Sequence, residues 1–254
     1  MIIRKTAAEI EEMRPACERA AEVLSRVVRW VRPGITTGEL DQYAAEQIAE
    51  LGAKSAFLGY HGYPGHICVS VNDEVVHGIP GDRVIHAGDV VSIDVGVVYR
   101  GWVGDNARTV AVGNTVPEVE LLLAATAGSL AAGIAAARVG NRIGDISHAV
   151  EEYVVARGFS VVREYVGHGV GRNMHEEPQI PNYGPAGRGP RLKAGMTLAI
   201  EPMVNMGVAA VKTLDDQWTV VTADGRPSAH FENTIVVTDG EPEILTCPLK
   251  TPFE

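Results

Sequence analysis

The 254-residue sequence contains few cysteines, few aromatic residues and no excess of positive charge. Its three cysteines, Cys17, Cys68 and Cys247, form no CxxC pair, so they indicate a reducing compartment and no disulfide framework. The net charge of −10 argues against a nucleic-acid scaffold and against binding to an anionic membrane surface. No signal-peptide core follows Met1, and no apolar run reaches about 18 residues, the length that suggests a transmembrane helix. We therefore expect a cytoplasmic protein with no nucleic-acid specificity and no membrane partner.

The sequence does contain enough hydrophobic residues, 46% of the total, to bury a substantial core. Three capping boxes predict helix starts, because a Thr side chain and a Glu three residues later satisfy the first free backbone amides. With the apolar periodicity, they predict helices over 6–31, 36–52, 115–137 and, after Gly144-Asp145, up to Gly158. Strands are predicted in a hairpin over 90–110 and over 160–165, 196–204, 208–213, 218–222 and 231–238, with a surface loop over 182–190.

An internal repeat relates two of the predicted helices. Residues 32–52 align without gaps on residues 138–158, at an offset of 106, and one Arg, three Gly and one Glu coincide. Because this offset is too long for a solenoid repeat, it predicts two related halves, each a helix pair followed by strands. We therefore expect a single catalytic domain over 1–254, with halves of roughly 1–112 and 113–254.

The predicted hairpin contains two aspartates, although Asp is depleted in strands. Asp94 and Asp105 are eleven residues apart, and side chains alternate faces along a strand. With an even-length loop near Arg100, both carboxylates therefore lie on one face, opposite or diagonal to each other. Like charges at that separation repel unless a cation lies between them. The alternative is one aspartate on an exposed edge strand and another in the turn.

Other charged and imidazole residues lie in equally apolar or Gly-rich segments. His168 and His175 lie in the Gly-rich segment 167–175, Glu201 and Glu232 interrupt apolar runs, and His77 precedes a Gly and a Pro. Taken singly, each has a simpler explanation as an exposed strand carboxylate or as a hydrogen-bonded core histidine.

Taken together, five of these residues make a plausible donor set for metal ions. They are Asp94, Asp105, His168, Glu201 and Glu232. Four carboxylates and one imidazole suit divalent Co, Mn, Fe or Zn, and the set lacks the thiolates of a structural zinc site. Four carboxylates also exceed the charge that one ion needs, which favours two ions that share bridging carboxylates. Such a pair can hold a hydroxide at neutral pH and polarise a carbonyl.

Seven motifs occur in the order and spacing of a known family: 60–64 YHGYP, 71–80 VNDEVVHGIP, 92–96 SIDVG, 104–105 GD, 167–179 GHGVGRNMHEEPQ, 199–205 AIEPMVN and 231–238 FENTIVVT. In these motifs the sequence resembles the type I methionine aminopeptidases of the bacterial kind, which are M24-type metallopeptidases. The resemblance implies the α+β pita-bread fold, also called creatinase/aminopeptidase-like. That fold has two pseudo-symmetric halves and a central antiparallel sheet covered by helices.

The resemblance also implies a role for each matching residue. The five donors above match the ligands of two metal ions, with Asp105 and Glu232 bridging, and Glu201 also matches the residue that shuttles the proton of the attacking water. His77 and His175 match the imidazoles that contact the scissile amide, and His175 is expected to stabilise the developing oxyanion. The methionine pocket is expected to be lined by Tyr60, Tyr63, Phe57, Cys68, Met174 and Trp218.

The implied activity is removal of the N-terminal methionine from nascent proteins when the second residue is small. We expect a monomer that makes transient contact with the ribosome. The sequence departs from the family pattern at Phe57, Met174 and His230, which affects the expected volume of the pocket and not the reaction. Two alternatives stay open. One is an Xaa-Pro aminopeptidase or prolidase on the same fold, and the other is a non-catalytic peptide-binding protein that has kept the fold.

Overall fold

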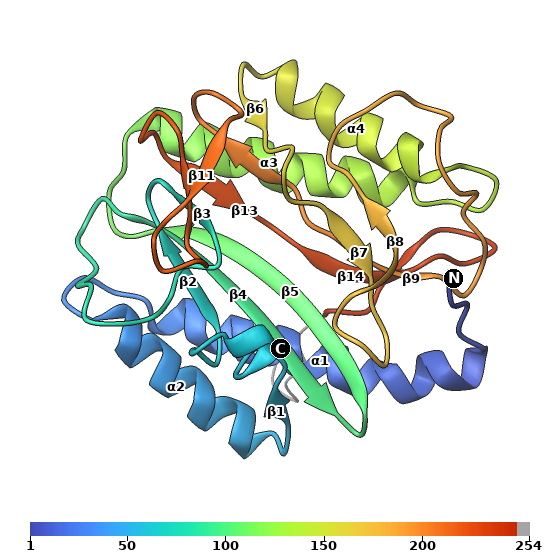
Figure 1. Cartoon of the computed structure of the whole chain (residues 1–254), viewed down its shortest axis with the longest axis horizontal. Coiled ribbons are helices and arrows are strands. Elements are labelled where there is room, and N and C mark those ends of the chain that lie inside the picture. Colours follow the sequence, from blue (N-terminus) through green and yellow to red (C-terminus); the bar gives the residue numbers. More distant parts are fainter. Residues whose placement is uncertain (248–254) are drawn as a thin grey trace.

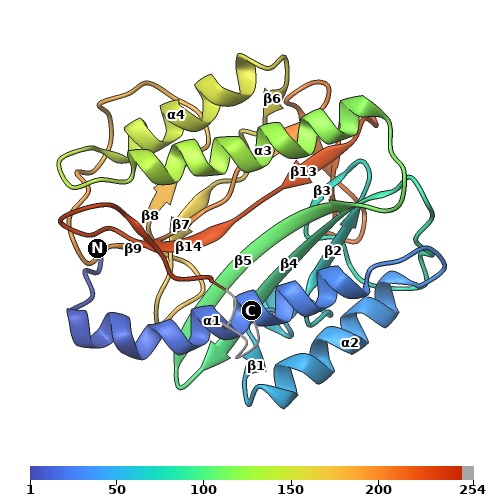
Figure 2. The same cartoon turned by 180° about the vertical axis from the view of Figure 1, so that it is seen from behind.

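The computed structural model describes residues 1–247, in which two helix pairs cover one side of a layer of antiparallel strands (Figure 1). The helices are α1 (Ala7–Trp30), α2 (Thr37–Glu50), α3 (Pro117–Ala136) and α4 (Ile143–Val155). Seen from behind, α1 and α3 each run across the front of the sheets, with α2 next to α1 and α4 next to α3 (Figure 2). The opposite side of the strands is therefore not covered by these two helix pairs.

The strands form four sheets, and every pairing found within residues 1–247 is antiparallel. The first sheet contains β1 (Lys54–Ser55), β2 (Cys68–Val71), β4 (Val90–Tyr99) and β5 (Trp102–Ala111). The second runs in the order β15 (Glu243–Ile244), β14 (Asn233–Val236), β9 (Thr197–Ile200), β7 (Gly167–Gly169) and β8 (Glu176–Ile180). Two smaller sheets contain β13 (Ser228–His230), β10 (Met203–Asn205) and β6 (Ser160–Val161), and β11 (Val211–Thr213), β12 (Val220–Thr222) and β3 (Glu74–Val76).

Two of the three predicted capping boxes are confirmed. Thr6 and Thr36 cap α1 and α2, and in each case the Glu side chain three residues later accepts from the backbone amide of the cap. The third is wrong, because α3 begins at Pro117 after Val116 and has no side-chain cap. Pro117 lacks an amide hydrogen and its fixed φ suits a first helical position, so it begins the helix without a box.

The two segments of the repeat have matching local structure. Gly34 and Gly140 both have positive φ, 93° and 97°, in the turn before α2 and α4. Gly38 and Gly144 both pack against backbone, since an added Cβ would lie 3.0 and 2.6 Å from a carbonyl oxygen. These correspondences agree with two pseudo-symmetric halves. The single catalytic domain divided near residue 112 stays a prediction, and its last residues, 248–254, lie outside the described part.

The hairpin of β4 and β5 places its two aspartates as predicted. Arg100 and Gly101 form the turn with φ of 50° and 76°, the backbone that a tight hairpin favours. Asp94 pairs with Ala107 and Asp105 with Gly96, so the two carboxylates are diagonal neighbours on one face. The edge-strand alternative is wrong, because β4 pairs with strands on both sides and Asp105 is only 2% exposed.

Several predicted strands are shorter than their apolar runs. The run 196–204 is divided into β9 and β10 at Glu201-Pro202, because proline has no amide hydrogen to donate to a ladder. Regular strand in 160–165 is limited to Ser160–Val161, and in 208–213 to Val211–Thr213. The predicted loop over 182–190 is confirmed as irregular. These runs of residues therefore contain shorter strands than their composition predicted.

One helix within residues 1–247, α3, is long and apolar enough to cross a membrane by length and composition, with a mean hydropathy of 1.7. The sequence had been expected to contain no such segment. In the fold 44% of its apolar window is buried, and Leu122, Leu130 and Ile134 face the interior. Such partial burial is typical of a core helix that covers a sheet.

The close contact between α1 and β5 at Gly104 yields a stability prediction. A Cβ on Gly104 would lie 2.5 Å from the carbonyl oxygen of Ala16 in α1. We expect Gly104→Ala to push the helix away and to lower the free energy of unfolding by about 1–3 kcal/mol, measured by denaturant titration. The control is Gly81→Ala, where an added Cβ meets no atom within 4 Å. Equal effects of the two substitutions would contradict this packing.

Candidate functional site

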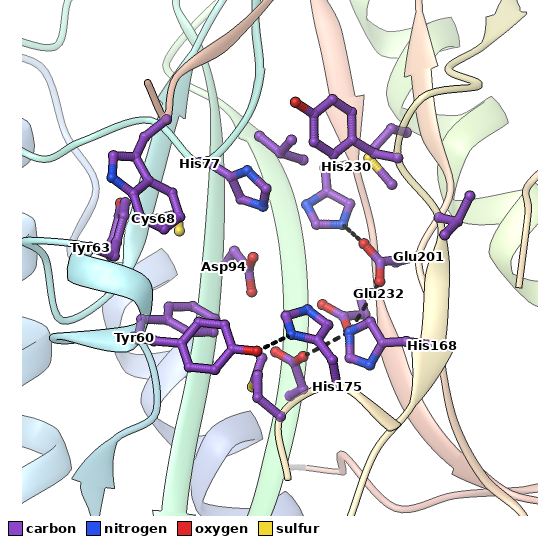
Figure 3. A pocket seen from close by; sticks show the side chains of 18 of the residues that line it. Tyr60, Tyr63, Cys68, His77, Asp94, His168, His175, Glu201, His230 and Glu232 are labelled. Carbon is purple, nitrogen blue, oxygen red and sulfur yellow. Dashed lines mark hydrogen bonds and ion pairs between the residues drawn. The ribbon is translucent and has the colours of Figure 1, made fainter. Parts of the chain in front are cut away.

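A cavity of about 370 Å³ lies between strands of the two halves. It brings together every residue predicted to bind metal or substrate, namely Phe57, Tyr60, Tyr63, Cys68, His77, Asp94, Asp105, His168, Met174, His175, Glu201, Trp218 and Glu232. Figure 3 shows the labelled members of this set, among them Asp94, His168 and Glu201, pointing into one space from opposite walls. The lining also contains residues that sequence reasoning did not single out, among them Tyr165 and Val166. Their only sequence signal is their place just before the Gly-rich segment 167–175.

Five different segments deliver the candidate ligands. Asp94 and Asp105 come from β4 and β5, and His168 comes from β7. Glu201 lies where β9 breaks before β10, and Glu232 lies between β13 and β14. The break at Pro202 thus ends regular pairing next to the carboxylate. Both halves therefore contribute to one cluster.

Distances within the cluster are those of groups that share a small volume. Ligand atoms of Asp105, His168 and Glu232 all lie within 4.8 Å of one another. The Nε2 atom of His168 is 3.4 Å from Oε1 of Glu201 and 3.7 Å from Oδ2 of Asp105. Asp94 faces the same space from the opposite wall (Figure 3).

Burial raises the pKa of each of the four carboxyl groups. It raises the pKa of Asp94 to about 7. Burial, followed by the charge of Asp94, raises the pKa of Asp105 well above its usual range. For Glu201 and Glu232 the causes are again burial first and then the neighbouring carboxylates. A positive charge within the cluster would therefore stabilise the ionised carboxylates.

Three carboxylate oxygens test whether metal ions fit here. The atoms Oδ1 of Asp94, Oδ1 of Asp105 and Oε1 of Glu232 are buried and have no hydrogen-bond partner among residues 1–247. An unsatisfied buried polar group costs roughly 1–3 kcal/mol, and more when it is charged. Burial lowers the pKa of His168 to about 4, so its imidazole is neutral and free to bind an ion. This donor set fits divalent cations.

His175 is held by Tyr60. The hydroxyl of Tyr60 is 2.7 Å from Nδ1 of His175, and the ring of His175 lies 4.3 Å from that of His168. Burial, and then nearby His61, lowers the pKa of His175, which favours the neutral ring. When Tyr60 donates to Nδ1, the ring proton resides on Nε2 and can be donated to another group. This contact gives Tyr60 a second role beside lining the pocket.

His77 lies on the other side of the cavity. It has a positive φ of 60°, and its ring meets the rings of Tyr165 and Trp218 edge-on at 5.5 and 6.3 Å. Burial, and then His175, lowers its pKa to about 4. His77 is therefore a neutral group within an aromatic wall.

One end of the cavity is apolar. Tyr63 donates its hydroxyl hydrogen to the carbonyl of Gly78 at 2.8 Å, which leaves its ring facing Trp218. Phe57 and Met174 are each 8% exposed. Cys68 lies opposite Asp94 in the ladder of β2 and β4, and burial followed by that carboxylate raises the pKa of its thiol.

Two departures from the family pattern have clear structural settings. Phe57 packs on Gly96, where an added Cβ would lie 2.4 Å from its ring, so glycine makes room for the larger side chain. His230 is buried, and its Nε2 atom lies 3.7 Å from Oε2 of Glu201 without a hydrogen-bond partner in the described chain. Burial lowers the pKa of His230 to about 3, so a neutral imidazole adjoins Glu201.

Residues 11–239 match the model of metallopeptidase family M24. The chain belongs to this family. It is 54% identical to the methionine aminopeptidase of Clostridium perfringens, over 97% of this chain and 99% of that protein. The structure of a methionine aminopeptidase from Thermotoga maritima matches with a TM-score of 0.95 at 48% identity, over 97% and 99% of the two chains. The resemblance seen in the motifs is thereby confirmed, and so is the pita-bread fold.

A more distant structural likeness concerns the fold alone. The prolidase from Pyrococcus furiosus matches with a TM-score of 0.78 at 23% identity, over 98% of this chain and 66% of that one. The shared fold therefore also occurs within a longer chain. This likeness gives no argument for the Xaa-Pro alternative.

The crowded carboxylates predict opposite effects of one substitution on stability and on metal binding. Glu232→Gln removes a carboxyl group whose ionisation is opposed first by burial and then by Asp105 and Glu201, so we expect the chelator-treated variant to unfold at a higher temperature than the chelator-treated wild type. Added Mn²⁺ or Co²⁺ should stabilise the wild type strongly and the variant little. Thermal unfolding with and without metal measures both effects. The control is Asp239→Asn, at an exposed position. If metal stabilised Glu232→Gln as much as the wild type, Glu232 would not be a metal ligand.

Proposed function

We propose that this M24 metallopeptidase is a methionyl aminopeptidase. It removes the N-terminal methionine from peptides whose second residue is small. The observation that carries the proposal is a cluster of candidate metal ligands, with two further neutral histidines, next to an apolar end of the same cavity. Identity of 54% to a methionine aminopeptidase supports the same reaction.

We assign two divalent ions to the five donors, which would hold them through four carboxylates and the imidazole of His168. The ligand atoms of Asp105, His168 and Glu232, all within 4.8 Å of one another, support this assignment. Bound divalent ions supply a nucleophile from water at neutral pH and polarise a carbonyl. The set accepts Co, Mn, Fe or Zn, and cellular supply decides among them.

We assign the proton transfer to Glu201. Its carboxylate lies between the imidazoles of His168 and His230, at 3.4 and 3.7 Å, so its orientation is restricted from both sides. Burial, and then the charge of Asp105, raises the pKa of its carboxyl group above the usual range of a glutamate. It accepts a proton from the attacking water and passes it to the leaving amine.

His175 and His77 contact the scissile amide in this proposal. With Tyr60 bonded to Nδ1, His175 presents its Nε2 hydrogen to the carbonyl oxygen as negative charge develops there. His77 lies across the cavity and contacts the substrate beyond the scissile bond. Neither residue belongs to the ligand set, so their contribution is made to the substrate.

The methionine side chain occupies the apolar end of the cavity, formed by Tyr63, Cys68, Trp218, Phe57 and Met174. An apolar wall that contains sulfur suits an unbranched thioether. The cluster of carboxylates attracts the free amine of the substrate. Cytoplasmic action as a monomer on nascent chains, with transient contact to the ribosome, stays a prediction from the sequence.

The two histidines outside the ligand set predict a division between catalysis and metal binding. We expect His175→Ala to depress kcat strongly, by about a hundredfold or more, because a transition-state contact is lost. His77→Ala should act in the same direction but less severely. Steady-state kinetics measure kcat, and metal analysis of the purified variants is the control. Loss of bound metal from either variant would count against this division of roles.

Substrate choice is the direct test of the proposed function. We expect Met-Ala-Ser and Met-Gly peptides to be cleaved and Met-Ile-Ser to be cleaved about a hundredfold more slowly, because a bulky second side chain meets the wall around His77. Norleucine should replace methionine, and large aromatic residues should not. Comparison of kcat/KM on these peptides, with an Xaa-Pro peptide included, decides the matter. Comparable values for Met-Ala-Ser and Met-Ile-Ser, or preference for Xaa-Pro, would refute the proposal.

A further inference from the structure

A buried ion pair lies beneath the loop that carries His175. The Nζ atom of Lys5 is 2.6 Å from Oε2 of Glu176, and the two side chains are 3% and 4% exposed. Lys5 precedes α1, whereas Glu176 begins β8 and directly follows His175. The pair thus joins the N-terminal segment to the residue beside a proposed catalytic group.

The same two side chains hold the loop at several points. Lys5 also donates to the carbonyl of Val170 at 3.0 Å, at the beginning of the loop. The second oxygen of Glu176 accepts from the backbone amides of Arg172 and Asn173, at 2.9 and 3.2 Å. The pair therefore contacts the loop at its beginning, in its turn and at its end.

The surroundings leave the pair little freedom to move. An added Cβ on Gly171 would lie 2.6 Å from Cε of Lys5 and 2.7 Å from Oε1 of Glu176. The backbone amide of Lys5 donates to the carbonyl of Gly195 at 2.7 Å. The backbone of Lys5 is thus held by Gly195, and its ammonium group is held by the loop.

We propose that Lys5 is a positioning residue that sets the place of His175 through Glu176, which rests on the proposed function of His175. Tyr60 contacts the ring of His175, and the ion pair holds the side chain of Glu176, the next residue along the chain. A buried ion pair is weak evidence for stability, because desolvation of the charges offsets their attraction. Its value here lies in geometry, since a displacement of about 1 Å at a reacting group can cost about a hundredfold in rate.

The first test removes the ammonium group and keeps the length of the side chain. We expect Lys5→Met to lower kcat on Met-Ala-Ser roughly tenfold to a hundredfold, while KM stays within about twofold and metal stoichiometry is unchanged. Lys193→Met, at an exposed lysine, is the matched control and should retain wild-type kinetics. A wild-type kcat for Lys5→Met would overturn the proposal.

A double variant separates positioning of His175 from general damage. If Lys5 acts through His175, Lys5→Met should lower the kcat of His175→Ala by no more than about twofold, because the group it positions is already absent. A further loss as large as the loss in the wild-type background would overturn the proposal and indicate a structural role only.

A second double variant guards against misfolding. Lys5→Met leaves Glu176 charged and unpaired in the interior, which is strongly destabilising, whereas Lys5→Met with Glu176→Gln buries no unpaired charge. We expect the double variant to recover most of the lost melting temperature while kcat stays low. Recovery of kcat together with stability would overturn the proposal.

Metal-loaded wild type that fails to cleave Met-Ala-Ser overturns the proposed function itself, whereas an active wild type with an unimpaired Lys5→Met overturns only this inference.

Discussion

Repulsion among four buried carboxylates is the constraint on which the rest of the structure depends. Two of them, Asp94 and Asp105, come from strands, and Glu201 and Glu232 come from breaks between strands. The four meet where burial raises the pKa of each. The helix pairs behind the sheets provide the packing that holds such a cluster together. A bound cation then converts the main unfavourable interaction of the fold into a link between its halves.

The sequence predicted those features that depend on local rules. The period of two along a strand was enough to place Asp94 and Asp105 on one face, and Thr-x-x-Glu was enough to start α1 and α2. The same rule failed at Thr115, where Pro117 begins the helix by itself. The shortened strands at Pro202 show that an apolar run says what is buried and not how long the ladder continues.

Contacts between distant segments were beyond such rules. The hydroxyl of Tyr60 reaches His175 over a separation of 115 residues, and Lys5 reaches Glu176 over 171. The motifs around Tyr60 and His175 marked both as site residues, but the local sequence does not say which distant partner each side chain contacts. The proposed methionine pocket shares this dependence, because Met174 lies in the same loop as His175. A side chain bound in that pocket would lie against the loop that carries the proposed oxyanion donor.

The thiol of Cys68 has a consequence for the chemical durability of the site. It lies across the ladder from Asp94, and burial with that carboxylate raises its pKa. A thiol that stays protonated is a poor nucleophile and a poor ligand, and it is oxidised slowly. The cavity thus has a sulfur-containing wall whose thiol, as a protonated group, reacts slowly with peroxide.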